Sequence, residues 1–134
     1  MDIRNVNVWA ILAATIAAFV LGGVWYSPLL FRNAWMRANA FTEKDLEGSR
    51  GKIFGLAFVY SLLMAFNFAM FLNDPSTTLA RGATVGFLAG LGWVALGLAV
   101  VALFERRSWQ YMVINGGYLT TVMVVMGAII GGWR

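Results

Sequence analysis

The sequence contains no cysteine and no histidine, only two prolines, and few charged residues among its 134 positions. Without cysteine the chain can form no disulfide, no thiolate metal site and no cysteine nucleophile. Without histidine it lacks the commonest metal ligand and the usual general base at neutral pH. It also carries no Ser-His-Asp set, no metal-ligand cluster and no phosphate-binding loop. We therefore predict no enzyme activity, no catalytic residue, no metal site and no cofactor.

Charge is scarce as well, because only 12% of the residues are charged while 60% are hydrophobic. Soluble domains are about 45–50% apolar, and so few charges cannot cover a soluble surface. The formal net charge is +4. The basic residues flank apolar runs, which points to a role in membrane topology and predicts no nucleic-acid partner.

Four long apolar runs dominate the chain instead, each close to the ~20 residues that cross a bilayer core. None shows the alternation of polar and apolar residues that is typical of barrel strands. The sequence predicts an all-α polytopic membrane protein, with residues 1–134 forming a single domain of four transmembrane helices. The predicted spans cover about residues 9–30, 53–72, 79–104 and 109–133, and residues 31–52 form a cytoplasmic loop.

The first run is predicted to be an uncleaved span and not a signal peptide. Asp2 and Arg4 make a poor positive flank, and the apolar stretch is longer than a signal peptide requires.

Lysine and arginine are distributed unequally between the two sides of these spans. The first and third loops carry seven of them: Arg32, Arg37, Lys44, Arg50, Lys52, Arg106 and Arg107. The N-terminus, the second loop and the C-terminus carry three: Arg4, Arg81 and Arg134. The positive-inside rule then predicts a protein of the cell inner membrane with both termini outside.

The stretch Gly22–Phe31 ends the first span, because Pro28 lacks a backbone donor and moves Ser27 out of the helical region. The apolar face that follows predicts a short interfacial helix on the cytoplasmic leaflet. An ordinary solvated connector is the alternative. Thr42–Asp45 resembles a capping box that starts another helix. The residues predicted to lie among lipid headgroups are Trp25, Arg32, Trp35 and Arg37.

Small residues recur at four-residue spacing, which lets helix backbones approach closely in a membrane. These predicted helix-packing residues are Gly82, Gly86, Gly90 and Gly97 in the third span, with Ala10, Ala14, Ala18 and Gly22 in the first. The stripes serve either packing within one bundle or self-association, for which the third span is the best candidate. The second span has no such stripe and is expected to face lipid.

No Asp or Glu lies inside a span, which argues against proton-driven antiport. Neutral polar groups remain, and with a rise of ~1.5 Å per residue five of them share one depth. This candidate polar layer consists of Tyr26, Ser27, Tyr60, Asn115 and Tyr118. It either lines a small polar pocket or ties helices together. Asn67 lies deeper, and Thr15 and Thr84 can bond to their own helix backbones.

The block Leu21-Gly22-Gly23-Val24-Trp25-Tyr26-Ser27-Pro28-Leu29-Leu30-Phe31, followed by Ala34-Trp35-Met36, resembles a family of small bacterial membrane proteins. It is the domain-of-unknown-function family 1761. The resemblance implies four membrane helices without an assigned activity and transfers no catalytic residue.

Three functions follow as expectations. The first is a non-enzymatic inner-membrane protein that forms a homo-oligomer in the lipid bilayer, or its sharper variant, a pore or carrier for a small solute. The second is a scaffold or accessory subunit that binds a membrane-protein partner or anionic lipid. A lipid-modifying enzyme has the least support, because the spans lack acids, bases and metal ligands.

Overall fold

The computed structural model describes residues 5–48 and 50–134, and its regular elements in this part of the chain are all helices. Four helices there are long and apolar enough to cross a membrane. They are α1 (Val8–Trp25), α3 (Arg50–Phe71), the continuous helix Leu79–Phe104, and α6 (Trp109–Gly132). The prediction of an all-α protein with four membrane-spanning helices is confirmed.

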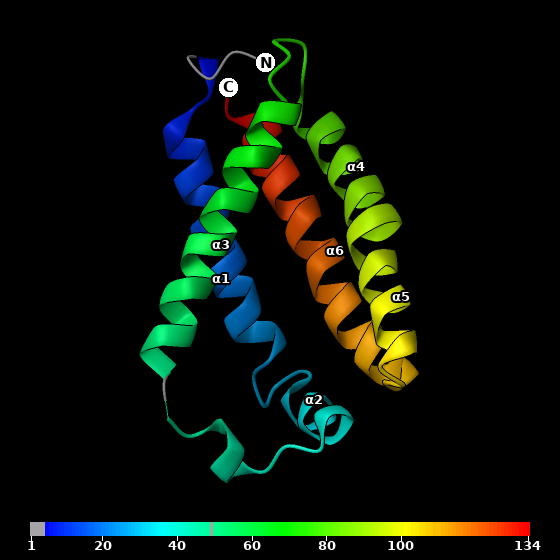
Figure 1. The fold of residues 1–134 in the computed structure, drawn as a ribbon. Coiled ribbons are helices and arrows are strands. Elements are labelled where there is room, and N and C mark those ends of the chain that lie inside the picture. Colours follow the sequence, from blue (N-terminus) through cyan, green and yellow to red (C-terminus); the bar gives the residue numbers. More distant parts are fainter. Residues whose placement is uncertain (1–4, 49) are drawn as a thin grey trace.

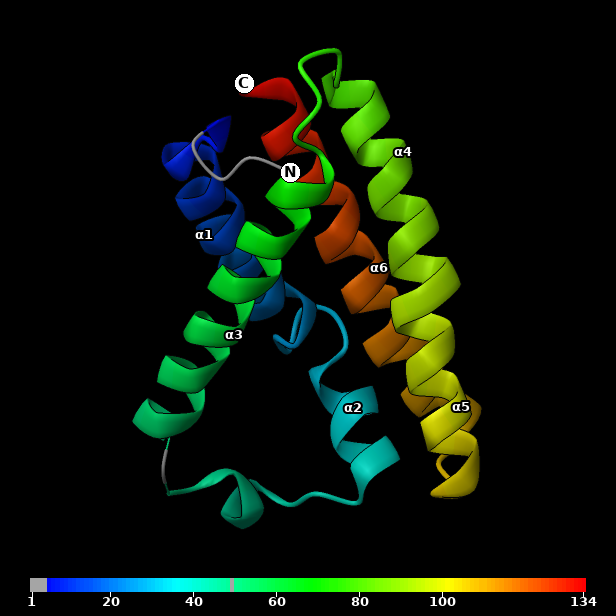
Figure 2. The same ribbon diagram turned by 45° about the horizontal axis from the view of Figure 1, so that its top comes forward.

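The four helices run alternately up and down, so the connections gather at two ends (Figure 1). Both termini and the α3–α4 connection lie at one end, which we call the termini end. The long α1–α3 connection and the short α5–α6 connection lie at the other, the loop end (Figure 2). Arg4, one of the charges used in the topology prediction, lies outside the described residues.

The helix Leu79–Phe104 contains three parts: α4 (Leu79–Ala89), the π-helical segment η3 (Gly90–Ala95) and α5 (Leu96–Phe104). Gly82, Gly86 and Gly90 all face α6 across a very close contact. A Cβ at Gly82 would overlap the Gly127 carbonyl, and one at Gly86 would overlap the Met123 carbonyl.

The wider turn of η3 keeps small residues on this side of the helix. After Gly90, the next small residue against α6 is Ala95, whose Cβ would lie 3.2 Å from a Cβ built at Gly116. Five residues separate Gly90 from Ala95, a spacing that one π-helical turn accommodates. The extra residue in the turn thus lets the glycine contact continue along α6.

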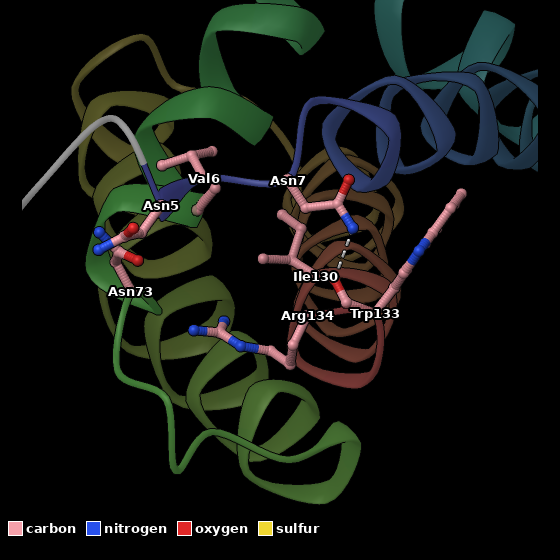
Figure 3. A pocket seen from close by; sticks show the side chains of 8 residues that line it. Asn5, Val6, Asn7, Asn73, Ile130, Trp133 and Arg134 are labelled. Carbon is pink, nitrogen blue, oxygen red and sulfur yellow. Dashed lines mark hydrogen bonds between the residues drawn. The ribbon is translucent and has the colours of Figure 1, made fainter.

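Three helix ends are tied together at the termini end (Figure 3). The Asn7 amide donates to the Trp133 carbonyl at 3.2 Å. The Arg134 guanidinium donates to the carbonyls of Leu72 at 2.7 Å and Asp74 at 2.9 Å. A cation at the carboxyl end of α3 also complements the helix dipole. A pocket of about 20 Å³ lies among these groups, room for about one water.

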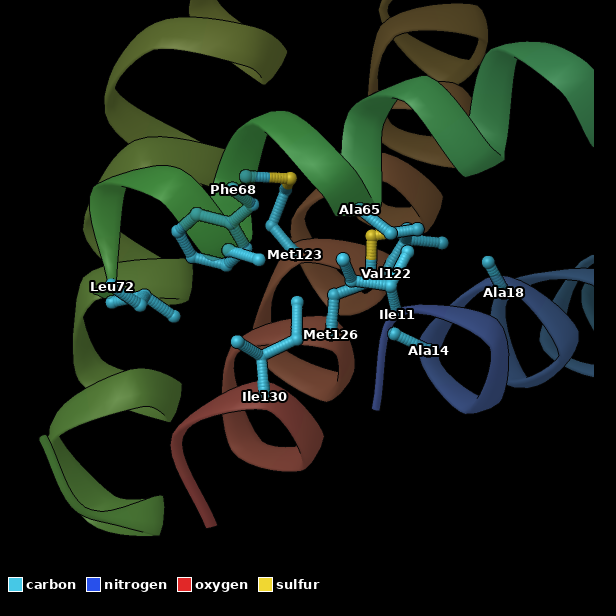
Figure 4. Packing of buried hydrophobic residues seen from close by; sticks show 11 residues of the cluster. Ile11, Ala14, Ala18, Ala65, Phe68, Leu72, Val122, Met123, Met126 and Ile130 are labelled. Carbon is cyan, nitrogen blue, oxygen red and sulfur yellow. The ribbon is translucent and has the colours of Figure 1, made fainter. Parts of the chain in front are cut away.

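The apolar core lies in the half of the bundle nearer the termini, between α1, α3 and α6 (Figure 4). Met126 of α6 and Ala14 of α1 are fully buried there. The cluster consists of Ile11, Ala14, Ala18, Ala65, Phe68, Ala69, Leu72, Val122, Met123, Met126 and Ile130. Its members from α3 all come from residues 65–72, so α3 is anchored by its last third.

The first half of α3 departs from the other helices as it runs toward the loop end (Figures 1 and 2). Between residues 50 and 60 every residue except Ala57 is exposed, although the Phe58 ring still meets Phe19 of α1 edge-on at 5.6 Å. A Cβ added at Gly51 or Gly55 would meet no atom within 4 Å. Apart from its contact with α1, this half-helix is therefore open within one copy of the chain.

The first span is shorter than predicted, because α1 ends at Trp25 and not near Leu30. Helix α2 (Arg32–Asn39) follows, and the 3-10 helix η2 (Glu43–Leu46) comes next. Thr42 starts η2 by donating its backbone N–H to the Asp45 carboxylate at 2.7 Å. That bond and the Thr42 hydroxyl lower the pKa of Asp45. Helix α3 begins at Arg50, three residues before the predicted span.

Candidate functional site

The candidate site begins at the turn that joins α1 to α2. Pro28 offers no backbone N–H, and the N–H of Phe31 donates to the Trp25 carbonyl at 3.0 Å. The N–H of Arg32 donates to the Ser27 carbonyl at 3.2 Å, and the Ser27 hydroxyl donates to the Val24 carbonyl at 2.6 Å. This compact turn directs α2 back toward α6.

Three side-chain hydrogen bonds fasten the end of α1 to α6. The Trp25 indole N–H donates to the Ile114 carbonyl at 2.9 Å. The Tyr26 hydroxyl donates to the Asn115 amide oxygen at 2.7 Å. In the other direction, the Tyr118 hydroxyl donates to the Ala18 carbonyl at 3.2 Å. Each bond joins groups about 90 residues or more apart in sequence, so together they fix α1 against α6.

Aromatic rings pack around these bonds. Tyr26 meets Tyr118 edge-on at a centroid distance of 5.3 Å and meets Trp35 of α2 at 5.6 Å. Trp25 packs on Phe31 at 4.9 Å, and Phe41 packs on Trp35 at 5.4 Å. Such contacts add about 0.5–1.5 kcal/mol each beyond the burial of their area. The cluster thus holds α2 on the bundle as well.

The structure brings together three of the five residues of the predicted polar layer: Tyr26, Asn115 and Tyr118. The Asn115 amide also donates to the Tyr111 carbonyl at 3.1 Å, so its donor and acceptor are both used. Ser27 bonds within its own turn. Tyr60 is 60% exposed on the open half of α3, away from the other four. In this arrangement the three joined residues tie helices to one another.

The residues predicted to lie among headgroups divide into two pairs. Trp25 and Trp35 face inward and pack in the aromatic cluster. Arg32 pairs with Glu43 at 3.1 Å. Among the described residues, the Arg37 guanidinium has neither an ion pair nor a hydrogen bond.

Most of the predicted helix-packing residues lie inside the bundle. Ala10, Ala14 and Ala18 are buried, and a Cβ at Gly22 would lie 2.9 Å from the Tyr118 hydroxyl. Gly82, Gly86 and Gly90 face α6, whereas Gly97 faces open space. Of the two uses predicted for the stripe of the third span, packing within one bundle is the one that Gly82, Gly86 and Gly90 serve, because α6 occupies it.

Thr15 and Thr84 bond to their own helices, as predicted. The Thr15 hydroxyl donates to the Ile11 carbonyl at 2.8 Å, and the Thr84 hydroxyl donates to the Ala80 carbonyl at 2.8 Å. Within residues 5–48 and 50–134, no three acidic side chains gather where they could hold a metal ion.

Sequence reasoning missed an exposed stripe on α3. Its members lie three or four residues apart and so share one helix face. We call these residues the α3 stripe: Ile53, Leu56, Tyr60, Leu63, Asn67 and Phe71, all exposed. The seven-residue spacing of Tyr60 and Asn67 was the available signal, because it places these two polar groups on one side of the helix.

The model of the family described as protein of unknown function (DUF1761) matches residues 9–131. The chain belongs to this family. No curated protein and no solved structure matches it.

Proposed function

We propose that this member of the DUF1761 family is a non-enzymatic multi-pass membrane protein that assembles with itself through the α3 stripe. The observation that carries the proposal is the exposure of Tyr60 and Asn67 on a membrane-spanning helix. Among the described residues neither side chain has a hydrogen-bond partner.

The depth of these two groups makes their exposure costly. At ~1.5 Å per residue, Tyr60 lies roughly 15 Å from either end of α3, near the middle of a bilayer core of ~30 Å. Asn67 lies roughly 6 Å inside the termini end of the same helix. Lipid tails offer neither donors nor acceptors, so an unpaired amide or hydroxyl there costs ~2–7 kcal/mol. A protein surface that supplies hydrogen bonds removes this cost.

A second copy of the chain supplies such a surface. An amide side chain carries both donors and an acceptor, so two Asn67 residues related by a two-fold axis can satisfy each other. The apolar members of the stripe repeat every three or four residues, the spacing by which two helices interlock. A polar residue in such a seam also fixes its register.

The glycine surface of the third span is less suited to association between two copies. Gly82, Gly86 and Gly90 already contact α6, so association through them would require the bundle to open. The first half of α3, in contrast, loses no internal contact when another helix packs on it. These contacts favour α3 over the third span as the association face.

A pore or carrier for a small solute has weaker support. Tyr26, Asn115 and Tyr118 direct their hydrogen bonds to one another and to helix backbones. A polar path would then require those bonds to break. A lipid-modifying enzyme also has weaker support, because the Tyr26 and Tyr118 hydroxyls of this cluster are already donated to Asn115 and to the Ala18 carbonyl.

Binding of anionic lipid by the Phe31–Arg37 segment is a second candidate function, and the unpaired guanidinium of Arg37 favours it. For both candidates we propose the inner membrane, with the loop end in the cytoplasm, because that end carries most of the lysine and arginine. Retention of phosphatidylglycerol over phosphatidylcholine by the purified chain tests this second candidate.

The proposed assembly is tested by counting fluorophores on single molecules of labelled protein in lipid bilayers at increasing dilution. We expect wild type to dimerise and Asn67→Leu to dissociate at roughly tenfold higher protein density, the equivalent of ~1.4 kcal/mol. Leu63→Ala tests an apolar position of the stripe. Leu96→Ala on α5 is the matched control, because Leu63 and Leu96 are 59% and 55% exposed.

Equal association of wild type, Asn67→Leu and Leu63→Ala would contradict the proposal. A loss of association in Leu96→Ala alone would place the interface on α5. A heterologous partner in place of a second copy would leave the purified wild type monomeric at every density.

A further inference from the structure

The groove between α2 and the start of α6 is a candidate ligand site at the loop end. It has a volume of about 320 Å³, and its lining is Ala34, Arg37, Ala38, Ser108 and Gln110. We propose that it binds the phosphate of an anionic phospholipid headgroup. The inference rests on the second candidate function, anionic-lipid binding, and locates it at one site.

The groove carries hydrogen-bond donors without internal partners. Among the described residues, the side chains of Arg37 and Gln110 make no hydrogen bond, and Arg37 makes no ion pair. The Ser108 hydroxyl oxygen accepts the backbone N–H of Tyr111 at 3.2 Å, which leaves the hydroxyl proton free to donate. A guanidinium, a hydroxyl and an amide together suit the oxygens of a phosphate.

The charge on the groove's own lining has one sign. None of its five lining residues is acidic. The nearby carboxylates are directed to other arginines: Glu43 pairs with Arg32 at 3.1 Å, and Glu105 lies 4.0 Å from Arg107. The potential at Arg37 is therefore not cancelled by a neighbouring acid.

A second arginine is held beside the groove. Arg107 approaches Asn39, at the end of α2, at 3.5 Å, and its guanidinium lies 5.0 Å from the centre of the Tyr111 ring. These contacts and the ion pair with Glu105 at 4.0 Å position the Arg107 guanidinium next to Ser108. The groove thus lies between one free arginine and one positioned arginine.

The depth of the groove indicates a lipid and not a solute as the source of the phosphate. The groove lies where α6 begins, next to Trp109, which is 69% exposed. An exposed tryptophan at the start of a span is typical of the headgroup layer. Ala34 and Ala38 give the groove an apolar wall of the kind that an adjoining acyl chain can contact.

Native mass spectrometry of the full chain in detergent tests this proposal, with phosphatidylglycerol titrated against phosphatidylcholine. We expect a preference for phosphatidylglycerol that falls roughly tenfold in Arg37→Gln and less in Gln110→Ala. Arg37→Lys should restore part of the affinity, since it keeps the charge. Arg81→Gln is the matched control: it makes the same change in net charge at an exposed arginine of the termini end.

Each outcome separates the site from the function. If Arg37→Gln and Gln110→Ala leave the preference for phosphatidylglycerol unchanged, the groove is not the binding site. The chain would still bind anionic lipid, but elsewhere. Equal binding of the two lipids would overturn both. Displacement of phosphatidylglycerol by millimolar inorganic phosphate would assign the groove to a soluble phosphate and contradict the lipid source. An unchanged circular dichroism spectrum of Arg37→Gln shows that the variant is folded.

Discussion

Two regions of the bundle differ in how they are packed. The α4–α6 contact is closed, whereas the first half of α3 is largely open. Both contain glycines, but Gly82 and Gly86 lie against the backbone of α6, whereas Gly51 and Gly55 meet nothing. Inside their spans, α6 carries Asn115 and Tyr118, which are paired, whereas α3 carries Tyr60 and Asn67, which are not. Within one copy of the chain the α4–α6 surface is fully packed, whereas the α3 stripe remains exposed.

The largest effect is expected from a side chain forced into the closed surface. Gly86→Leu places a Cβ against the Met123 carbonyl, so the helices must separate, and we expect a loss of more than about 3 kcal/mol of stability. Unfolding in mixed detergent micelles measures it. Gly97→Leu is the control, because its Cβ enters open space. A similar loss in both variants would mean that α4 and α6 do not pack as described.

A smaller change in stability is expected to distinguish Asn115 of α6 from Asn67 of α3. Asn115→Leu removes the bond from Tyr26 and the bond to the Tyr111 carbonyl, and we expect it to destabilise the monomer by about 1 kcal/mol. Asn67→Leu should leave monomer stability unchanged or slightly higher and weaken only association. Unfolding curves at low protein-to-detergent ratio distinguish them. Equal destabilisation would show that Asn67 is already paired within one chain.

The smallest effect concerns the end where α3 is anchored. The backbone N–H and the hydroxyl of Ser76 donate to Asp74 at 2.8 and 2.7 Å and lower the pKa of its carboxyl. A lowered folded-state pKa stabilises the fold above the unfolded-state value, near 3.9, and this contribution is lost as pH falls through the folded-state value.

We therefore expect the connection between α3 and α4 to loosen below about pH 4. Hydrogen exchange at the N–H of Ser76 measures this loosening, after correction for the intrinsic pH dependence of exchange. Asp74→Asn should flatten the remaining pH dependence. An equally steep acid response in Asp74→Asn would assign the response to another group.

The sequence was sufficient for the four long helices, but not for the directions in which their side chains point. Rise per residue placed Tyr60 at nearly the same height as Asn115, yet the two lie on different sides of the bundle. Height follows from counting residues, whereas direction around the helix depends on which helix packs where. For the same reason, the spacing of Gly82, Gly86 and Gly90 predicted a close contact without identifying α6 as the partner.

Local hydrogen bonding explains the other differences. The first span ends at Trp25 because the turn at Pro28 is closed by backbone bonds that apolar composition does not reveal. The π-helical turn at Gly90–Ala95 keeps small residues against α6, a tertiary contact that the local sequence does not reveal. The capping residue Thr42 and the short helix after Pro28 were predicted because their signals are local.

Disulfide crosslinking shows whether the bundle is closed along α4 and α6 and open along α3. The chain has no cysteine, so single cysteines at Leu56 and Leu63 on α3, and at Leu96 and Leu103 on α5, report without background. In oxidised membranes we predict crosslinked dimers through both α3 positions and monomers for both α5 positions. Dimers through the α5 positions, with the α3 positions uncrosslinked, would show that the chain associates through α5 and not through α3.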